Sequence, residues 1–208
     1  MLIKICGITR PEDAKAAVDA GANALGFVFW PGSPRFIDPY RARAIVRRLP
    51  PFITPVGLFV NQPRDYIGGV ASLVRLGAVQ LHGDEPPEFA ASIDWPIIKA
   101  LPVDRAAAWP AGTNDTMLLL DVHDPVKRGG TGQTIDWSAA AAIAAKRRVL
   151  LAGGLTPENV AEAVERVRPF GIDVSSGVER APGVKDQRKI SALFERLHAI
   201  NHHPAGSR

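Results

Sequence analysis

Short runs of apolar and β-branched residues alternate along the whole chain with segments in which apolar residues recur every three or four positions. The first pattern is typical of strands and the second of amphipathic helices, so we expect repeated strand–helix units on a parallel sheet. There are eight such units. Their strands are expected at residues 2–6, 24–29, 54–60, 78–81, 96–100, 117–120, 149–152 and 171–174.

The number of units decides between two parallel-sheet architectures. A doubly wound open sheet usually has five or six strands and a glycine-rich turn after the first strand, whereas Gly7 stands alone there. Eight units leave about 26 residues for each, which is compact for a barrel of roughly 250 residues. We therefore predict an α/β fold with a single (β/α)8 barrel over residues 1–200 and a flexible tail over residues 201–208.

Two of the expected helices carry start signals. Thr9 precedes Pro11 and Glu12 in the pattern of a capping box, and Thr156 precedes Pro157, a residue that suits the first helical position. The helices of the first and seventh units are therefore expected to begin at Pro11 and Pro157.

Composition is that of an ordinary globular domain, with 46% hydrophobic and 22% charged residues and a formal charge of +4. The basic residues are dispersed, so no nucleic-acid partner is expected. The N-terminus lacks the apolar stretch of a signal peptide, and no run approaches the roughly 18 apolar residues of a spanning helix. We expect a cytoplasmic protein with no membrane partner, acting as a monomer or a homodimer. Cys6 is the only cysteine, which excludes an internal disulfide and fits a reducing compartment.

Polar residues interrupt the apolar strands at alternating positions. In a barrel, one alternating set of side chains fills the interior and the other meets the helices. An unpartnered buried polar group costs about 1–3 kcal/mol, so this many interior polar side chains indicate a function. Several lie at the carboxyl ends of strands, where barrel enzymes build their active sites. The candidates are Lys4, Cys6, Gln80, His82, Lys99, Asp121, Asp173 and Ser175.

Cys6 and Asp121 are the candidates for proton transfer. A lone cysteine is most often a small buried hydrophobic residue. Cys6, however, ends the first strand with Lys4 behind it and a helix start ahead, and both features lower the pKa of a thiol. Asp121 ends an apolar run, although it could instead cap the loop that follows. His82 could likewise serve only to bond the turn at Gly83.

Two loops of small residues follow the last two strands. Gly153 and Gly154 come after the seventh strand, and Ser175, Ser176 and Gly177 come after the eighth. Backbone N–H groups in these loops, near a helix N-terminus, form the usual phosphate site of this fold. Either loop alone is consistent with a simple turn. Together they favour a phosphorylated small molecule as substrate.

Arg35, in the loop after the second strand, is a candidate for binding a second anionic group. Its planar guanidinium can pair with a carboxylate through two hydrogen bonds. A solvated loop arginine is the alternative. Trp30 in the same loop either stacks on an aromatic substrate or closes the loop.

Short motifs recur in a characteristic order at residues 4–9, 26–29, 33–35, 56–61, 79–83, 119–121, 129–132, 153–155, 157–160 and 173–179. In their order and identity these motifs resemble the phosphoribosylanthranilate isomerase family over nearly the whole chain.

The resemblance implies the Amadori rearrangement of N-(5'-phosphoribosyl)anthranilate to 1-(2-carboxyphenylamino)-1-deoxyribulose 5-phosphate in tryptophan biosynthesis. It implies that Asp121 is the general acid that opens the ribose ring and that Cys6 is the general base at C2'. Proton transfer of this kind needs one acid and one base and requires neither a metal nor another cofactor.

The resemblance also implies the residues that hold the substrate. Arg35 would bind the anthranilate carboxylate, and the two loops would bind the phosphate. Gln80, His82 and Asp173 are expected to contact the substrate as well. The chain departs from the family pattern at Gln133, where a lysine is usual, and at Ile135 in place of phenylalanine. We expect this change to affect loop closure or affinity rather than the chemistry.

Two other kinds of protein remain as alternatives. The first is another phosphosugar isomerase or epimerase barrel. A metal-dependent epimerase would need paired His and Asp ligands at several strand ends, and residues Trp30 and Pro31 at the tip of the second strand offer none. The second is a noncatalytic phosphate-binding barrel, which would need neither Cys6 nor Asp121.

Overall fold

The computed structural model describes residues 1–110, 116–122 and 135–201. Residues 202–208 of the expected tail, and Gln133, lie outside the described residues. The strands of the barrel are β1 (Leu2–Ile5), β2 (Ala24–Val28), β3 (Thr54–Phe59), β4 (Ala78–Leu81), β5 (Ile97–Leu101), β6 (Met117–Leu120), β7 (Val149–Leu151) and β8 (Gly171–Val174). The helices are α1 (Pro11–Ala20), α2 (Pro39–Val46), α3 (Arg64–Val74), α4 (Pro87–Ala91), α5 (Val103–Ala106), α6 (Trp137–Ala144), α7 (Val160–Val167) and α8 (Gln187–Asn201).

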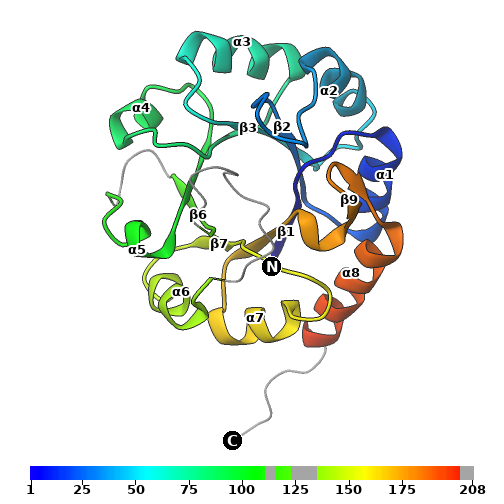
Figure 1. Cartoon of the computed structure of the whole chain (residues 1–208), viewed down its shortest axis with the longest axis vertical. Helices are drawn as coiled ribbons and strands as arrows, with labels where there is room; N and C mark the ends of the chain where they lie inside the picture. The colour runs from blue at the N-terminus through cyan, green and yellow to red at the C-terminus, as the bar shows by residue number, and fades with distance from the viewer. Residues whose placement is uncertain (111–115, 123–134, 202–208) are drawn as a thin grey trace, which may run out of the picture.

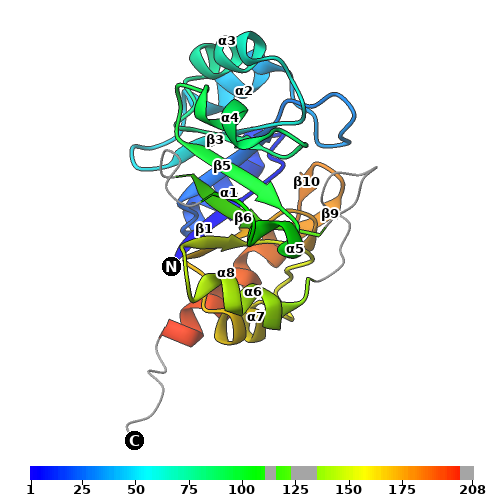
Figure 2. The same cartoon turned by 90° about the vertical axis from the view of Figure 1, so that its left-hand side faces the viewer.

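The eight strands form a closed parallel barrel in sequence order, because β8 pairs with β1. Figure 1 looks along the barrel and shows the strands in the centre with the helices in a ring around them. Seen from the side in Figure 2, α2, α3 and α4 lie on one side of the strands and α6, α7 and α8 on the other. The predicted fold class, a single (β/α)8 barrel, is confirmed.

Strand ends match the expected boundaries to within one residue, and β4, β6 and β8 match at both ends. Of the two predicted helix starts, that of α1 at Pro11 is confirmed, although its predicted cap is not. Thr9 does not cap α1; its hydroxyl donates instead to the carbonyl of Gly183. The predicted start of the seventh helix is wrong, because α7 begins at Val160. The Asn159 side chain accepts from Thr156 N and donates to the carbonyl of Gly154, which closes a turn before the helix.

The strand side chains pack in two sets, as the alternation predicts. Ile3 and Ile5 belong to the large core between strands and helices, whereas Leu2 and Cys6 belong to small clusters inside the barrel. Inside the barrel, the parallel register sets Lys4 beside Asp173, and Lys4 Nζ donates to Asp173 Oδ1 over 2.8 Å. The polar interior therefore begins at the pairing of the first and last strands.

A short hairpin follows β8 that the strand pattern did not predict. It consists of a 3-10 turn, η1 (Ser176–Val178), and two antiparallel strands, β9 (Glu179–Ala181) and β10 (Val184–Lys185). Figure 2 shows it projecting on the side toward which the barrel strands point. Its backbone is tied to α1, because Lys185 N donates to the buried carboxylate of Asp13. The hairpin thus brings buried side chains to the end of the barrel at which the strands end.

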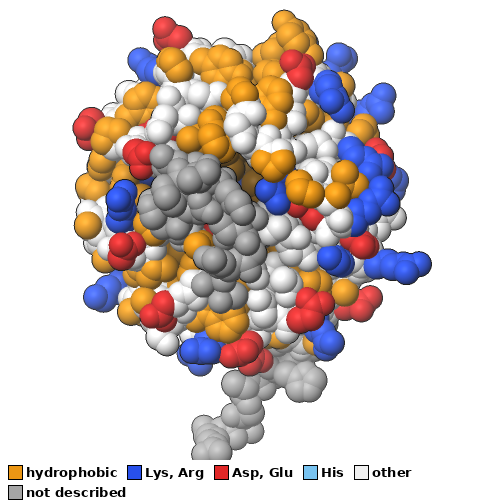
Figure 3. All heavy atoms as spheres, viewed as in Figure 1, with side chains coloured by type: hydrophobic (Ala, Val, Ile, Leu, Met, Phe, Trp, Pro, Cys, Tyr) orange, Lys and Arg blue, Asp and Glu red, His pale blue; other side chains and the backbone are white. Residues whose placement is uncertain are grey.

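The charged surface is mixed. On the face shown in Figure 3, acidic and basic side chains alternate around the rim, apart from one group of basic side chains on the right of the view. Within the part of the chain that the structure describes, no helix has the length and apolar character needed to span a membrane.

Candidate active site

Cys6 lies just past the end of β1, inside the barrel, with 5% of its surface exposed. Its neighbour across the strand is Gly26 on β2. A Cβ atom at Gly26 would lie 2.7 Å from Cys6 Sγ and 3.1 Å from Lys4 Nζ, so the thiol and the ammonium converge above this glycine. Lys4 is itself held by Asp173. The structure thus brings Cys6 into a buried group with one cation and one carboxylate.

The electrostatics of this group differ from the expectation for Cys6. Burial raises the pKa of the Cys6 thiol, and the charge of Lys4 lowers it by less, so the net shift is upward. The predicted lowering is therefore wrong, because the cost of burying a thiolate, together with the charge of Asp173, outweighs the charges of Lys4 and Lys185. For Lys4, burial alone would lower the pKa, but the Asp173 carboxylate and the Cys6 sulfur together outweigh burial and raise the pKa, so the ammonium keeps its charge.

Titration of the thiol should show this shift directly. Because Cys6 is the only cysteine, the ultraviolet absorbance of thiolate reports on this residue alone. We expect the absorbance to rise at a higher pH than for an exposed cysteine, since the thiolate is destabilised by burial. Cys6→Ser serves as the baseline. A thiolate already formed at neutral pH would contradict the upward shift.

Asp121 follows β6 at the same end of the barrel. Its Oδ1 accepts the backbone N–H of Val122 over 2.8 Å, and its Oδ2 lies 3.3 Å from Nε2 of His82. His82 follows β4, and its Nδ1 is 2.8 Å from the amide nitrogen of Gln80. Asp121 and His82 are 13% and 10% exposed, whereas Gln80 has no exposed surface. Three of the expected site residues therefore form one connected row.

The two phosphate-loop candidates pack against each other. Gly153 and Gly154 both have positive φ angles, of 79° and 63°, which glycine adopts without strain. A Cβ at Gly177 would lie 1.8 Å from the carbonyl oxygen of Leu155, so the loop after β8 touches the loop after β7 at this point. A Cβ at Gly153 would lie 3.5 Å from Asp121 Oδ1. The first loop therefore borders the candidate acid.

Replacing Gly177 with alanine should push these two loops apart. The added methyl group would overlap a backbone carbonyl, which cannot rotate away as a side chain can. We expect a stability loss of about 1–3 kcal/mol, as for other overpacked sites, and a raised KM for a phosphorylated substrate. Thermal unfolding and steady-state kinetics measure both. The control is Gly69→Ala on α3, where an added Cβ meets nothing within 4 Å; unchanged KM in Gly177→Ala would contradict the expectation.

Ser175 and Ser176 take different places in the second loop. The hydroxyl of Ser175 donates to the carbonyl of Cys6 over 3.2 Å, which ties the loop to the end of β1. Ser176 begins the turn η1. Ser175 also lies beside Arg35, since a Cβ at Gly7 would contact the side chains of both residues.

Arg35 is held by an acidic residue that sequence reasoning did not single out. Its Nε and Nη2 donate to the carboxylate of Glu179 on β9, with the shortest contact at 2.8 Å. Lys185 Nζ donates over 2.9 Å to Glu179 Oε1, an oxygen that Arg35 Nε also contacts, and over 3.1 Å to the carbonyl of Ser175. Burial would raise the pKa of Glu179, but the hydrogen bond from Arg35 and the charge of Lys185 lower it overall. Glu179 therefore fixes the orientation of the Arg35 guanidinium.

Glu179 and Lys185 were missed because the hairpin that carries them was not predicted. The buried hairpin position of Lys185 gives no periodic signal in the sequence, since β10 has only two residues. For Lys185, burial lowers the pKa and the Glu179 carboxylate opposes this only in part.

The expected site residues are thus brought to one end of the barrel in two connected groups. One group joins Arg35, Ser175 and Cys6 on the side of β1, β2 and β8. The other joins Gly153, Asp121 and His82 on the side of β4, β6 and β7. Cys6 and Asp121 follow strands that are three steps apart around the closed barrel.

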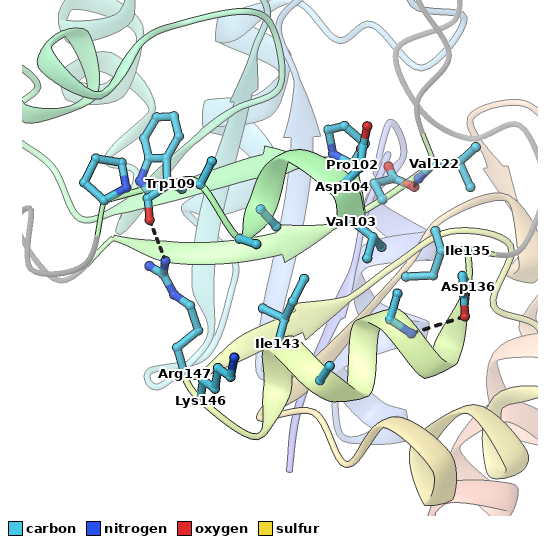
Figure 4. Close-up of a pocket in the computed structure, with 17 residues that line it drawn as sticks. Pro102, Val103, Asp104, Trp109, Val122, Ile135, Asp136, Ile143, Lys146 and Arg147 are labelled. Carbon is cyan, nitrogen blue, oxygen red and sulfur yellow. Dashed lines mark hydrogen bonds between the residues drawn. The ribbon is translucent and has the colours of Figure 1, made fainter.

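A cavity of about 1050 Å³ opens between α5 and α6. Figure 4 shows Val122, Ile135 and Asp136 at one end of it and Trp109 and Arg147 at the other. Asp121 lines this cavity. Within the described residues, its lining includes neither Cys6 nor Arg35, so the cavity is a neighbour of the two groups and not the space between them.

No group of three or more His, Cys, Asp and Glu side chains that could hold a metal ion occurs in residues 1–110, 116–122 and 135–201.

A family model described as N-(5'-phosphoribosyl)anthranilate (PRA) isomerase matches residues 3–196. The chain belongs to this family. It is therefore an enzyme of the isomerase class.

Individual relatives agree with this assignment. The N-(5'-phosphoribosyl)anthranilate isomerase of Pelobacter propionicus is 53% identical over 190 residues, which cover 90% of this chain and 91% of the relative. The crystal structure of phosphoribosyl anthranilate isomerase from Thermus thermophilus superposes with a TM-score of 0.86 at 46% identity, covering 96% and 100% of the two chains. A further isomerase structure, in complex with reduced 1-(o-carboxyphenylamino)-1-deoxyribulose 5-phosphate, has a TM-score of 0.84 at 42% identity, with the same coverage.

Proposed function

We propose that this isomerase converts N-(5'-phosphoribosyl)anthranilate into 1-(2-carboxyphenylamino)-1-deoxyribulose 5-phosphate in tryptophan biosynthesis. The observation that carries the proposal is the family match over residues 3–196. The relative with bound reduced product analogue supports the same substrate class. In this reaction Asp121 is the general acid and Cys6 is the general base.

The first step opens the ribose ring. Asp121 donates its proton to the ring oxygen, the bond from C1' to that oxygen breaks, and its electron pair stays on the oxygen. The lone pair of the anilino nitrogen forms the C1'=N bond of a Schiff base. The resulting Asp121 carboxylate is stabilised by the N–H of Val122, which already donates to Oδ1.

The second step moves a proton from C2'. Cys6, as thiolate, takes this proton; the C2'–H electron pair forms a C1'=C2' bond, and the iminium electrons return to nitrogen. The enolamine becomes the ketone when the C2' hydroxyl loses a proton and C1' gains one. The upward pKa shift of Cys6 lowers the thiolate population and makes each thiolate a stronger base. Lys4, whose Nζ lies beside the thiol, stabilises the anion.

Binding groups surround the reacting atoms. Gly153 and Gly154, with Ser175, Ser176 and Gly177, bind the phosphate through backbone N–H groups and hydroxyls. Arg35 binds the anthranilate carboxylate. Its Nε and Nη2 are occupied by Glu179, so we assign the carboxylate contact to Nη1. Asp173 acts by holding Lys4 in place.

The test is turnover by the purified protein. Freshly made N-(5'-phosphoribosyl)anthranilate is added with a chelator present and no cofactor, and the loss of anthranilate-type fluorescence is followed. Rapid loss supports the proposal. A folded protein that binds inorganic phosphate without turning over this substrate would instead indicate a noncatalytic phosphate-binding barrel, and activity on a pentose phosphate alone would indicate an epimerase.

A further inference from the structure

Gln80 was expected to contact the substrate, and the structure gives it no exposed surface. Its side chain faces the ring of His82, with Gln80 Nε2 2.8 Å from His82 Nδ1. The opposite ring nitrogen, Nε2, lies 3.3 Å from Asp121 Oδ2. Gln80 and His82 thus link the barrel interior to the candidate acid, and the proposed proton transfers use neither residue.

We propose that Gln80 is a positioning residue that holds His82 as the neutral tautomer protonated at Nε2, so that this N–H faces Asp121. The proposal rests on the function proposed for Asp121. An amide N–H pointing at Nδ1 requires a lone pair there, because two donors cannot share the contact. With the amide nitrogen facing Nδ1, the contact suits a ring that has its lone pair on Nδ1 and its proton on Nε2.

The charge of the His82 ring matters because Asp121 must hold a proton to act as the general acid. An imidazolium at 3.3 Å would favour the carboxylate form of Asp121 and leave it without a proton to give. A neutral ring carries no such charge. After the proton has left, the N–H at Nε2 and the N–H of Val122 face one carboxylate oxygen each, and the first contact can tighten as the charge develops.

The orientation of the Gln80 amide agrees with this tautomer. Its Oε1 is buried and has no hydrogen-bond partner within the described part of the chain. Turning the amide around would place two N–H donors at that position instead, and an orphaned donor group is rarer in proteins than an under-used carbonyl. A buried amide with one unpartnered end is costly where an aliphatic side chain would fit, which indicates that the end facing His82 has a function.

Buried side chains bond the backbone next to His82. Lys99 on β5 donates from Nζ to the carbonyl of Gly83 over 2.8 Å and to the buried carboxylate of Glu85 over 2.7 Å. Glu85 in turn accepts the N–H of Gly83 over 2.9 Å. The residue after His82 is therefore fixed from both its N–H and its carbonyl, which holds the ring between Gln80 and Asp121.

Nitrogen-15 NMR of the ring nitrogens tests the proposal on the wild-type chain. The His82 signals are assigned by their loss in His82→Gln, which separates them from the other four histidines. We expect Nδ1 to have the shift of an unprotonated nitrogen and Nε2 that of a protonated one. A His82 protonated at Nδ1, alone or together with Nε2, would overturn the proposal without any assay of activity.

Two variants of similar size supply the kinetic test. Gln80→Met removes the donor, and we expect kcat to fall about tenfold, the factor equivalent to one hydrogen bond of about 1.4 kcal/mol. KM should stay within about twofold, because in the proposed role Gln80 acts on His82 and not on the substrate. Gln80→Glu offers an acceptor in place of the donor and should lower kcat further, with a ring signal shifted toward the imidazolium.

The outcomes separate this inference from the proposed function. An active Asp121→Asn would remove the function assigned to Asp121, whatever the tautomer of His82. An inactive Asp121→Asn together with unchanged kcat in a folded Gln80→Met would overturn the inference alone. A raised KM with unchanged kcat would also overturn it, since Gln80 would then act on binding.

Discussion

Asp121→Asn should lower kcat by about 100- to 10,000-fold, the range that a positioned general acid contributes. Asparagine has nearly the same shape and can still accept the N–H of Val122 at its amide oxygen. It has no acidic proton, so the ribose ring oxygen leaves without protonation. The variant should bind substrate with a similar Kd but unfold at a lower temperature, because its amide nitrogen then faces the N–H proposed at His82 Nε2. Steady-state fluorescence assays measure kcat, and calorimetry measures binding.

An isotope experiment identifies the step that Asp121 serves. With substrate deuterated at C2', the wild type should show an isotope effect to the extent that proton removal limits the rate. In Asp121→Asn, ring opening becomes limiting, and the effect should shrink toward one. The assignment of Asp121 as acid would be wrong if the variant kept the wild-type rate, or if it lost activity with an undiminished isotope effect.

Cys6→Ser should lower kcat by a similar factor, about 100- to 10,000-fold, because a serine hydroxyl is far harder to deprotonate than a thiol. The substitution changes one atom in the buried group above Gly26, so the ion pair of Lys4 with Asp173 should persist. Here proton removal from C2' becomes slower, so the isotope effect should stay or grow. The opposite responses of the two variants distinguish the acid step from the base step.

The matched control is Cys6→Ala, which removes the group entirely. If Cys6 is the base, alanine and serine should be comparably slow while substrate binding survives in both. Activity near that of the wild type in Cys6→Ala, with the fold intact, would exclude Cys6 as the base and leave only a packing role beside Val28 and Leu58.

Much of the architecture could be predicted from local pattern alone. Strand boundaries follow from runs of apolar residues whose alternating sets must be buried on two sides, so their ends matched to within one residue. The count of eight units excluded an open sheet. Cys6, Asp121 and the small-residue loops were recognisable because each stands at the carboxyl end of an apolar strand, where a parallel barrel collects its polar groups.

The failures share a cause. The start of α7 depends on the hydrogen bonds of Asn159 with Gly154 and Thr156. The predicted cap of α1 is absent because Thr9 bonds a hairpin residue 174 positions away. Both are choices between hydrogen-bond partners that a local pattern cannot rank. The pKa of Cys6 was predicted with the wrong sign because the sequence shows the neighbouring cation and not the depth of burial.

The sequence by itself determined the fold class, and it predicted which end of the barrel carries the site and which residue types exchange protons there. These properties depend on the periodicity and the order of the residues, which can be read directly from the sequence. Only the tertiary structure decided how those groups are held: Arg35 by Glu179 and Lys185, Cys6 by Lys4 above Gly26, and Asp121 beside a histidine that Gln80 faces. Such contacts join distant segments, and their energies depend on burial and distance, which exist only once the barrel has closed.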